Sequence, residues 1–395
     1  MRIKEYYLLV LYLILISLYI CGCNTNNEGT ILKNEKEANE SVTVINGISE
    51  IDNYIEDKSK MENYVKPIKV EICTHGGMFL LENGDLYTFG SQNNMPLGRS
   101  DENYQPSKIL EDIVDIALGE TMALAIDKNC NLWGWCATDD DSWDEYELEP
   151  FPQIIANNVK DVSVGEWEDV IAIIKEDKSL WLWGNTKVAC NAMEEFTRIL
   201  ENVSYVSVSD DSCGVAILDD NSMWVWGELL ALGIVADKPV CYSEDIKAVT
   251  CSHSLAYIDQ EDFMTIFCMN EREEISNVST ISNALKIDFG YCNGLYLLKN
   301  GELYSWGSSN EYGQFGIGVP SWGEEGVSKI ELAEATKILE NVIDFDMTAY
   351  TAIALNEEGY VYVWGQNMNN ILGLDNIDDV IAIPTILYSE MHAHG

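Results

Sequence analysis

The sequence predicts an all-β protein, a seven-bladed β-propeller, and three observations support this fold class. A five-residue phrase recurs seven times along the chain, with aromatic residues at two of its positions in six of the copies. The segments between the copies are short, apolar and separated by turn residues, with no helical period. Both faces of the aromatic segments are apolar, so each predicted strand is covered on both sides.

The copies of this aromatic phrase are regularly spaced. They end at residues 90, 136, 184, 227, 268, 307 and 365, which are 39 to 58 residues apart. The copy at 264–268 is the weakest, so we expect the fifth blade, about residues 244–270, to be eroded. Repeats of this length without helices are typical of propeller blades.

One strand shows why a ring is preferred over a sandwich. In residues 180–183, Leu-Trp-Leu-Trp, alternate side chains point to opposite faces, and all four are apolar. A sandwich would leave one face of each sheet wet, whereas sheets stacked radially are covered on both faces. Tryptophan supplies the large area that such packing needs, so we assign Trp181, Trp183, Trp224, Trp226, Trp306 and Trp364 to the core.

A second phrase precedes most copies, as in residues 108–113, 198–203 and 337–342. We assign it to the first strand of each blade. The first copy, residues 65–89, lacks it, and the similar residues 384–388 have no repeat after them. We therefore expect residues 383–388 to complete the first blade, so that the C-terminal strand closes a propeller spanning residues 65–390.

The N-terminal segment reads as an export signal. Residues 6–20 form an apolar run of 15 residues, which is short for a membrane span but suits a secretory signal. The following Ile20, Gly22 and Cys23 resemble the lipobox of bacterial lipoproteins, which implies a signal peptide over 1–22 and lipidation (palmitate) of Cys23. An uncleaved anchor is the alternative. Residues 23–64 are polar and predict a flexible tether.

These features predict a location. We expect the chain to be exported and lipid-anchored to the outer side of the bacterial cytoplasmic membrane or at the cell surface. The N-terminal lipid would be its only contact with the membrane, because 66 acidic against 23 basic residues give a net charge of −43. That charge opposes adsorption to anionic lipid and binding to nucleic acid. It favours a basic partner.

The repeat resembles a known family. Residues 354–367, followed by Leu372 and Gly373, are similar to the phrase of regulator of chromosome condensation repeats, and residues 303–316 fit nearly as well. The resemblance covers about residues 65–388 and implies a seven-bladed propeller. Cys136 and Cys268 depart from it, since glycine is usual at both positions. A fold of this kind says little about function.

Family members suggest different functions. The eukaryotic founder is a nucleotide-exchange factor for a small GTPase, but no residues here match its exchange apparatus. A secreted bacterial member inhibits β-lactamases by laying aromatic-rich loops over the enzyme. From that resemblance we take the mode of binding, and we expect a scaffold that binds an unknown protein or glycan through loops on one face.

The candidate binding residues lie in predicted loops rather than strands. Exposed aromatic side chains among charges are typical of interface anchors. A solvated acidic loop is the alternative for the first group, at 139–146. The candidates are Asp139, Asp141, Trp143, Asp144, Tyr146, Trp167 and Trp322.

The sequence offers no catalytic set, and we predict a protein that is not an enzyme. There are four histidines, of which His75 and His253 read as turn residues, and the eleven cysteines show no metal-type spacing. We therefore expect no metal and no cofactor. Two alternatives remain, a glycan-acting extracellular hydrolase and a guanine-nucleotide exchange factor. A convergent acid pair in the central channel would favour the hydrolase.

Overall fold

The computed structural model describes residues 64–91, 96–100, 103–136, 149–165, 170–184, 195–209, 213–229, 232–251, 255–269, 275–277, 281–290, 293–321, 326–375 and 378–389. All of them belong to one compact unit, Glu62–Gly395. Within the described ranges the regular structure is β-strand, apart from the 3-10 turns η4 (Leu332–Glu334) and η5 (Met368–Asn370). No helix in this part of the chain is long and apolar enough to cross a membrane.

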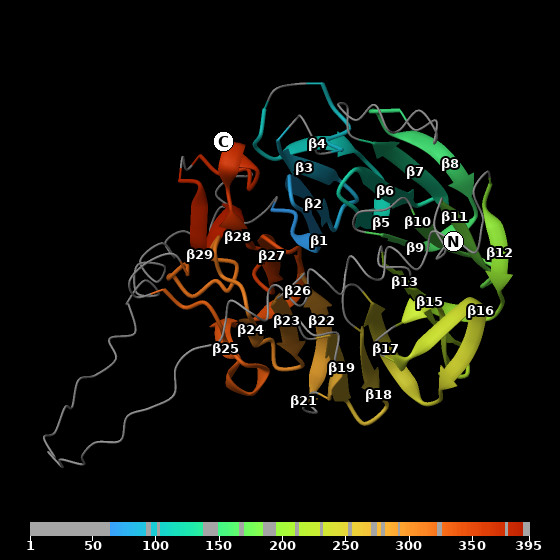
Figure 1. Ribbon diagram of the computed structural model, residues 1–395. Helices are drawn as coiled ribbons and strands as arrows, with labels where there is room; N and C mark the ends of the chain where they lie inside the picture. Colours follow the sequence, from blue (N-terminus) through green and yellow to red (C-terminus); the bar gives the residue numbers. More distant parts are fainter. Residues whose placement is uncertain are drawn as a thin grey trace, which may run out of the picture. The chain divides into compact units, whose positions relative to one another are not determined.

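Seven antiparallel sheets stand side by side in a ring, which confirms the predicted seven-bladed β-propeller (Figure 1). Each sheet is one blade, and its strands follow one another in the sequence from the centre of the ring outward. Blades 1 to 3 are β1 (Pro67–Cys73), β2 (Gly76–Leu81), β3 (Leu86–Gly90) and β4 (Ser107–Leu110); β5 (Ile113–Leu118), β6 (Met122–Asp127), β7 (Asn131–Cys136) and β8 (Gln153–Asn157); and β9 (Val159–Val164), β10 (Val170–Lys175), β11 (Leu180–Gly184) and β12 (Thr197–Leu200).

The remaining four blades follow the same plan. Blade 5 is the weak copy, and its outer edge is divided between two short strands that both pair with β19. Blades 4 to 7 are β13 (Val203–Val208), β14 (Cys213–Leu218), β15 (Met223–Leu229) and β16 (Ile234–Ser243); β17 (Ile246–Cys251), β18 (Leu255–Asp259), β19 (Phe263–Met269), β20 (Ile275–Asn277) and β21 (Ile281–Ser282); β22 (Ala284–Phe289), β23 (Asn293–Leu298), β24 (Leu303–Gly307) and β25 (Thr336–Leu339); and β26 (Val342–Met347), β27 (Thr351–Asn356), β28 (Val361–Gln366) and β29 (Val380–Tyr388).

The aromatic phrase forms the third strand of each blade and packs between blades as predicted. Trp226 and Trp364 are fully buried and Trp306 is 7% exposed. Trp181, Trp183 and Trp224 are only half-buried, so the core assignment is confirmed for three of the six tryptophans and is wrong for these three. A small residue lies opposite several of these rings; Gly294, for example, is the cross-strand partner of Trp306, and a Cβ there would lie 1.9 Å from the indole.

The assignment of the second phrase was wrong. Residues 108–113 do not form the first strand of a blade; they include the end of β4, the outermost strand of blade 1, and the start of β5 in blade 2. The phrase therefore crosses from one blade to the next. The phrase has the same spacing whether it forms the first strand of one blade or the outer strand of the blade before it. Spacing alone therefore could not distinguish these two assignments.

The C-terminal strand is corrected for the same reason. Blade 1 already has its own outer strand β4, and β29 pairs with β28 to complete blade 7 rather than blade 1. Its last residue still lies at the closure of the ring, because the ring centroid of Tyr388 is 4.8 Å from that of Phe79 in blade 1. The ring thus closes by packing between complete blades.

Two ends of the blades differ in their connections. We call "turn face" the end that carries the tight turns near residues 82–85, 128–130, 176–178, 219–221, 260–262, 299–301 and 357–359 together with the links between blades. We call "loop face" the opposite end, where the first strand joins the second and the third joins the fourth. Six links on the turn face carry Asn or Asp at φ 57–62°, a conformation these residues tolerate: Asp112, Asn158, Asn202, Asp245, Asn283 and Asn341.

Backbone hydrogen bonds on the turn face tie each blade to the one before it. The first amide of blade 2, Ile113 N–H, donates to Gly84 O at 3.0 Å, and five later blades repeat this bond. Blade 1 begins with Pro67, which has no N–H. At this seam the Tyr64 hydroxyl donates to Gly359 O at 2.7 Å instead. Where the ring closes, a side-chain hydroxyl thus replaces the backbone amide as the donor that links two blades.

Candidate functional site: the loop face and the central channel

The predicted binding residues fall outside the described part of the chain. Asp139, Asp141, Trp143, Asp144 and Tyr146 lie within 137–148, Trp167 within 166–169 and Trp322 within 322–325. Cys23, with the predicted signal peptide and nearly all of the tether, also lies outside the described residues.

The strands flanking three of these segments end on the same face. β7 leads into 137–148, β9 leads into 166–169 and β24 leads into the segment that contains 322–325. β7, β9 and β24 are the first or third strands of their blades, and in an antiparallel blade those strands run in the same direction. The three connections therefore start from the loop face, although they belong to blades 2, 3 and 6.

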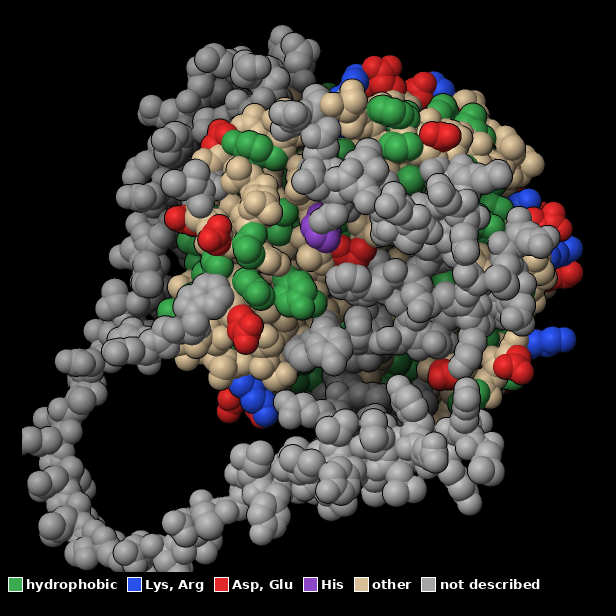
Figure 2. Space-filling view, turned by 45° about the horizontal axis from the view of Figure 1, so that its top comes forward, with side chains coloured by type: hydrophobic (Ala, Val, Ile, Leu, Met, Phe, Trp, Pro, Cys, Tyr) green, Lys and Arg blue, Asp and Glu red, His purple; other side chains and the backbone are tan. Residues whose placement is uncertain are grey.

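The described surface is chemically mixed. Figure 2 shows apolar side chains and acidic side chains interspersed, with lysine and arginine at the edge of the view beside acidic groups. Surface ion pairs include Lys178 with Asp219 at 2.7 Å and Lys128 with Asp112 at 2.8 Å. Many of the basic residues are thus already paired, so the remaining surface is acidic.

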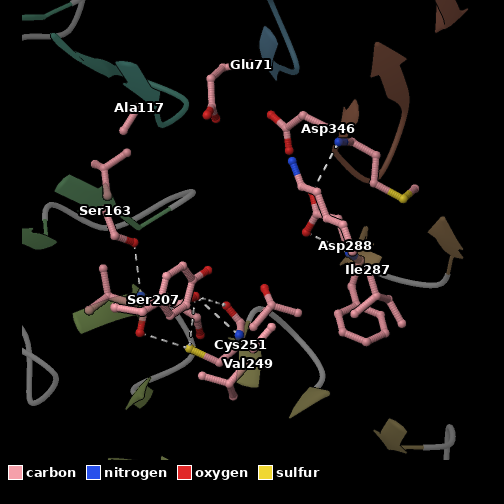
Figure 3. A pocket seen from close by; sticks show the side chains of 18 of the residues that line it. Glu71, Ala117, Ser163, Ser207, Val249, Cys251, Ile287, Asp288 and Asp346 are labelled. Carbon is pink, nitrogen blue, oxygen red and sulfur yellow. Dashed lines mark hydrogen bonds between the residues drawn. The ribbon is translucent and has the colours of Figure 1, made fainter. Parts of the chain in front are cut away.

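The centre of the ring holds a cavity of about 600 Å³ lined by the innermost strands (Figure 3). The fifth residue of every innermost strand lines it, and many of these residues are polar. They are Glu71, Ala117, Ser163, Ser207, Thr250, Asp288 and Asp346. The third residues of the same strands add Lys69, Asp161, Tyr205 and Lys286 to the lining.

Carboxylates in the channel accept hydrogen bonds from the backbone of the next blade. Ile72 N–H donates to Asp346 Oδ2 at 2.7 Å, and Val70 N–H donates to Asp344 Oδ2 at 3.1 Å. Both bonds cross from blade 7 to blade 1. The innermost strand of a blade is a sheet edge, and its inward backbone groups need partners. The side chains of the preceding blade provide them.

Elsewhere around the channel, side chains also bind the backbone of a neighbouring blade. Lys69 Nζ donates to Ile116 O and Lys286 Nζ to Phe345 O, both at 2.6 Å. Serine hydroxyls take the same role in blades 3 and 4. Val208 N–H donates to Ser163 Oγ at 3.2 Å, and Cys251 N–H donates to Ser207 Oγ at 3.3 Å. Each of these bonds runs from one blade to the next in chain order.

Burial in the channel shifts the acids toward their neutral forms. Burial raises the pKa of Glu71 to about 8 against the opposing attraction of Lys69, 3.3 Å away. Burial and the charge of Asp115 raise the pKa of Asp161 to about 6. Burial and the neighbouring Asp288 push the pKa of Asp346 well above its usual range. The channel therefore holds protons at neutral pH.

The two lysines stay charged. Burial acts to lower the pKa of Lys69, but Glu71 and Asp115 outweigh it, so its pKa is raised. Asp344 and Asp346 similarly outweigh burial and raise the pKa of Lys286. Paired ions of this kind tie blades together, and they gain little net energy because both charges lose water.

Asp288 and Asp346 form the convergent acid pair that would favour a hydrolase, but they are arranged for a structural role. The two carboxyl groups hydrogen-bond to each other, whereas glycosidase pairs stand about 5 Å or more apart to admit a sugar. Backbone amides also hold them: Met347 N–H donates to Asp288 and Ile72 N–H to Asp346. The pair joins blades 6, 7 and 1.

Sequence reasoning expected a central channel but missed the residues that line it. Their signal is an alternation at the start of each blade, in which the third and fifth residues are often polar and the fourth and sixth mostly apolar. This alternation could be found only once the strand starts were placed correctly. Sequence reasoning also missed the contact between His75 and the buried Glu120 on the loop face. The two residues are 45 positions apart in the sequence and belong to different blades.

Comparisons with known proteins agree with this architecture. The model of the regulator of chromosome condensation (RCC1) repeat matches residues 285–314, in blade 6. An RCC1 domain-containing protein of Dictyostelium discoideum is 25% identical over 241 residues, which cover 50% of this chain and 34% of that protein. The chain thus matches about a third of the length of this curated relative.

Solved structures share the fold at low identity. Prp20p from Saccharomyces cerevisiae superposes with a TM-score of 0.63 at 16% identity, covering 80% of this chain and 88% of that one. Human WBSCR16 gives a TM-score of 0.59 at 14% identity, with coverages of 77% and 93%. Fold and repeat together define a β-propeller with one repeat per blade. The chain is similar to RCC1-repeat proteins in one matched repeat and in fold.

Proposed function

We propose that this propeller is a non-catalytic scaffold that binds another protein through its loop face. The observation that carries the proposal is the use of the channel's polar side chains. Four of them, Lys69, Lys286, Asp344 and Asp346, bind the backbone of a neighbouring blade and are therefore engaged in holding the ring together. The connections that contain the predicted aromatic and acidic anchors, by contrast, start from strand ends on one face.

The relatives support a protein partner. The yeast Prp20p structure is described together with that protein's binding properties to Gsp1p and histones. A net charge of −43 favours a basic partner for this chain, since charge of opposite sign steers encounter and suppresses wrong partners. A glycan partner and nucleotide exchange rest on resemblance and loop composition alone, so we place the protein partner first.

Removing two loop tryptophans tests this proposal. We expect the full chain carrying Trp143→Ala and Trp322→Ala to recover at least ~10-fold less of its principal partner from cell-surface extracts, since hot-spot aromatics carry 2 kcal/mol or more each. Tyr242→Ala is the matched control, because this exposed aromatic lies on the outer strand β16. Equal recovery by all three proteins would remove these loops from the proposal, and recovery of polysaccharide would favour a glycan partner.

We further propose that Cys23 carries a lipid that anchors the chain outside the bacterial cytoplasmic membrane. The support is the apolar run at 6–20 followed by Ile20, Gly22 and Cys23. Metabolic labelling with a fatty-acid analogue should mark the wild-type chain and the Cys21→Ser control, and Cys23→Ser should lose the label. An unlabelled wild-type chain, or a labelled Cys23→Ser variant, would contradict the anchor.

A further inference from the structure

A buried carboxylate joins blades 1 and 2 on the loop face. Glu120 lies in the connection between β5 and β6, and its side chain is 2% exposed. One oxygen, Oε1, accepts hydrogen bonds from Thr74 N–H at 2.8 Å and from the Thr74 hydroxyl at 2.5 Å. These two bonds fix the carboxylate against the turn between β1 and β2.

The second oxygen of Glu120 faces a histidine and has no hydrogen-bond partner. Glu120 Oε2 lies 3.4 Å from His75 Nδ1, and both atoms are buried without a hydrogen bond among the described residues. The His75 side chain is 31% exposed, although its Nδ1 atom is buried. Buried polar atoms without partners are rare, and each calls for a cause.

Charge adds to the argument. A buried carboxylate is costly unless a positive charge compensates it. In the described part of the chain, the ion-pair partner found for Glu120 is His75. A cation held between the two groups would supply that charge.

The spacing fits a cation of the zinc class. Zinc binds imidazole nitrogen and carboxylate oxygen at about 2.0–2.2 Å, and two such ligands at a tetrahedral angle stand ~3.4 Å apart. The two atoms here are 3.4 Å apart, and neither is engaged elsewhere. No group of three or more His, Cys, Asp or Glu side chains among the described residues could hold a metal, so the described residues supply two ligands to this site.

We propose that His75 Nδ1 and Glu120 Oε2 bind one zinc-class divalent cation across the seam of blades 1 and 2. Water would fill the other two positions of a tetrahedral site. Binding requires a neutral imidazole, so the cation competes with a proton for Nδ1. With two protein ligands the affinity is lower than that of closed structural sites. The site is independent of the proposed binding function.

Titration with Zn²⁺ alone tests the site. The full chain is used with His392→Gln and His394→Gln, because that C-terminal histidine pair is a competing ligand. We expect calorimetry to show one bound equivalent. Adding His75→Gln or Glu120→Gln should each lower the affinity ~10-fold or more, as even loss of an outer-shell partner costs that much. Glu357→Gln, an exposed carboxylate on the turn face, is the matched control.

Using both ligand variants allows a loss of Zn²⁺ binding to be distinguished from a loss of folding. Glu120 holds Thr74, so Glu120→Gln is checked by its thermal unfolding without metal, and the surface variant His75→Gln gives a second reading. Unchanged affinity in His75→Gln with normal folding would overturn the proposal. So would the absence of any Zn²⁺ binding, which would leave a proton-linked ion pair as the explanation of the geometry.

Discussion

Replacing Trp364 with alanine should lower the free energy of unfolding by about 4 kcal/mol. The side chain is fully buried and packs in the cluster that joins blades 6, 7 and 1. Its indole Nε1–H donates to Gln314 O, in the connection of blade 6, at 3.0 Å. Alanine would leave both a cavity and a buried carbonyl without its donor.

Equilibrium denaturation in urea measures this effect, and a second variant separates its two causes. Trp364→Phe keeps most of the packing but removes the donor, so we expect a loss of about 1–2 kcal/mol. Ala352, the cross-strand partner of Trp364, is unchanged in both variants. A loss below about 1 kcal/mol for Trp364→Ala would mean that the seam between blades 6 and 7 is not packed as described.

Replacing Glu71 with glutamine should stabilise the protein above neutral pH. Its pKa is raised by burial from near 4.5 to about 8, so between these values the folded state holds a proton that the unfolded chain releases. The stability contributed by this group is present below pH 4.5 and is lost as pH rises toward 8. Glutamine has no proton to lose, so the variant should gain on the order of 4 kcal/mol at pH 8.

The pH profile of unfolding checks this sign. Wild-type stability should fall between pH 5 and 8, and the Glu71→Gln profile should be flatter, with the two curves meeting near pH 4.5. Lys69 keeps Asp115 as a partner at 2.6 Å in the variant. Glu357→Gln, which is exposed, should leave the profile unchanged. If Glu71 instead made the wild-type protein more stable as pH rises from 5 to 8, the burial of its carboxyl group would be contradicted.

The aromatic phrase was sufficient to predict seven blades because its large apolar side chains must pack between sheets. Side chains such as Trp226 and Trp364 must be covered on both sides, and only a closed stack of sheets covers all of them. The order of strands within a blade was less well determined. Residues 108–113 belong to two blades at once, so the C-terminal strand was given to blade 1 when it completes blade 7.

The lining of the channel and the His75–Glu120 pair could not be predicted from local patterns. Asp346 and Ile72 are 274 positions apart and meet only because the ring closes. Glu120 sits in a loop whose neighbours in sequence give no sign that it reaches the turn of another blade. The loop residues Trp143, Trp167 and Trp322 remain predictions, since they lie outside the described residues.

Hydrogen exchange at the seam of blades 7 and 1 tests the closed ring most directly. The amides of Val70 and Ile72 lie on the inner edge of β1, where an open array would leave them to solvent. Here they donate to Asp344 and Asp346 of blade 7. We predict that both amides exchange as slowly as those in the middle of β2. Exchange at the rate of unstructured peptide would mean that blade 7 does not meet blade 1 and that the ring is open.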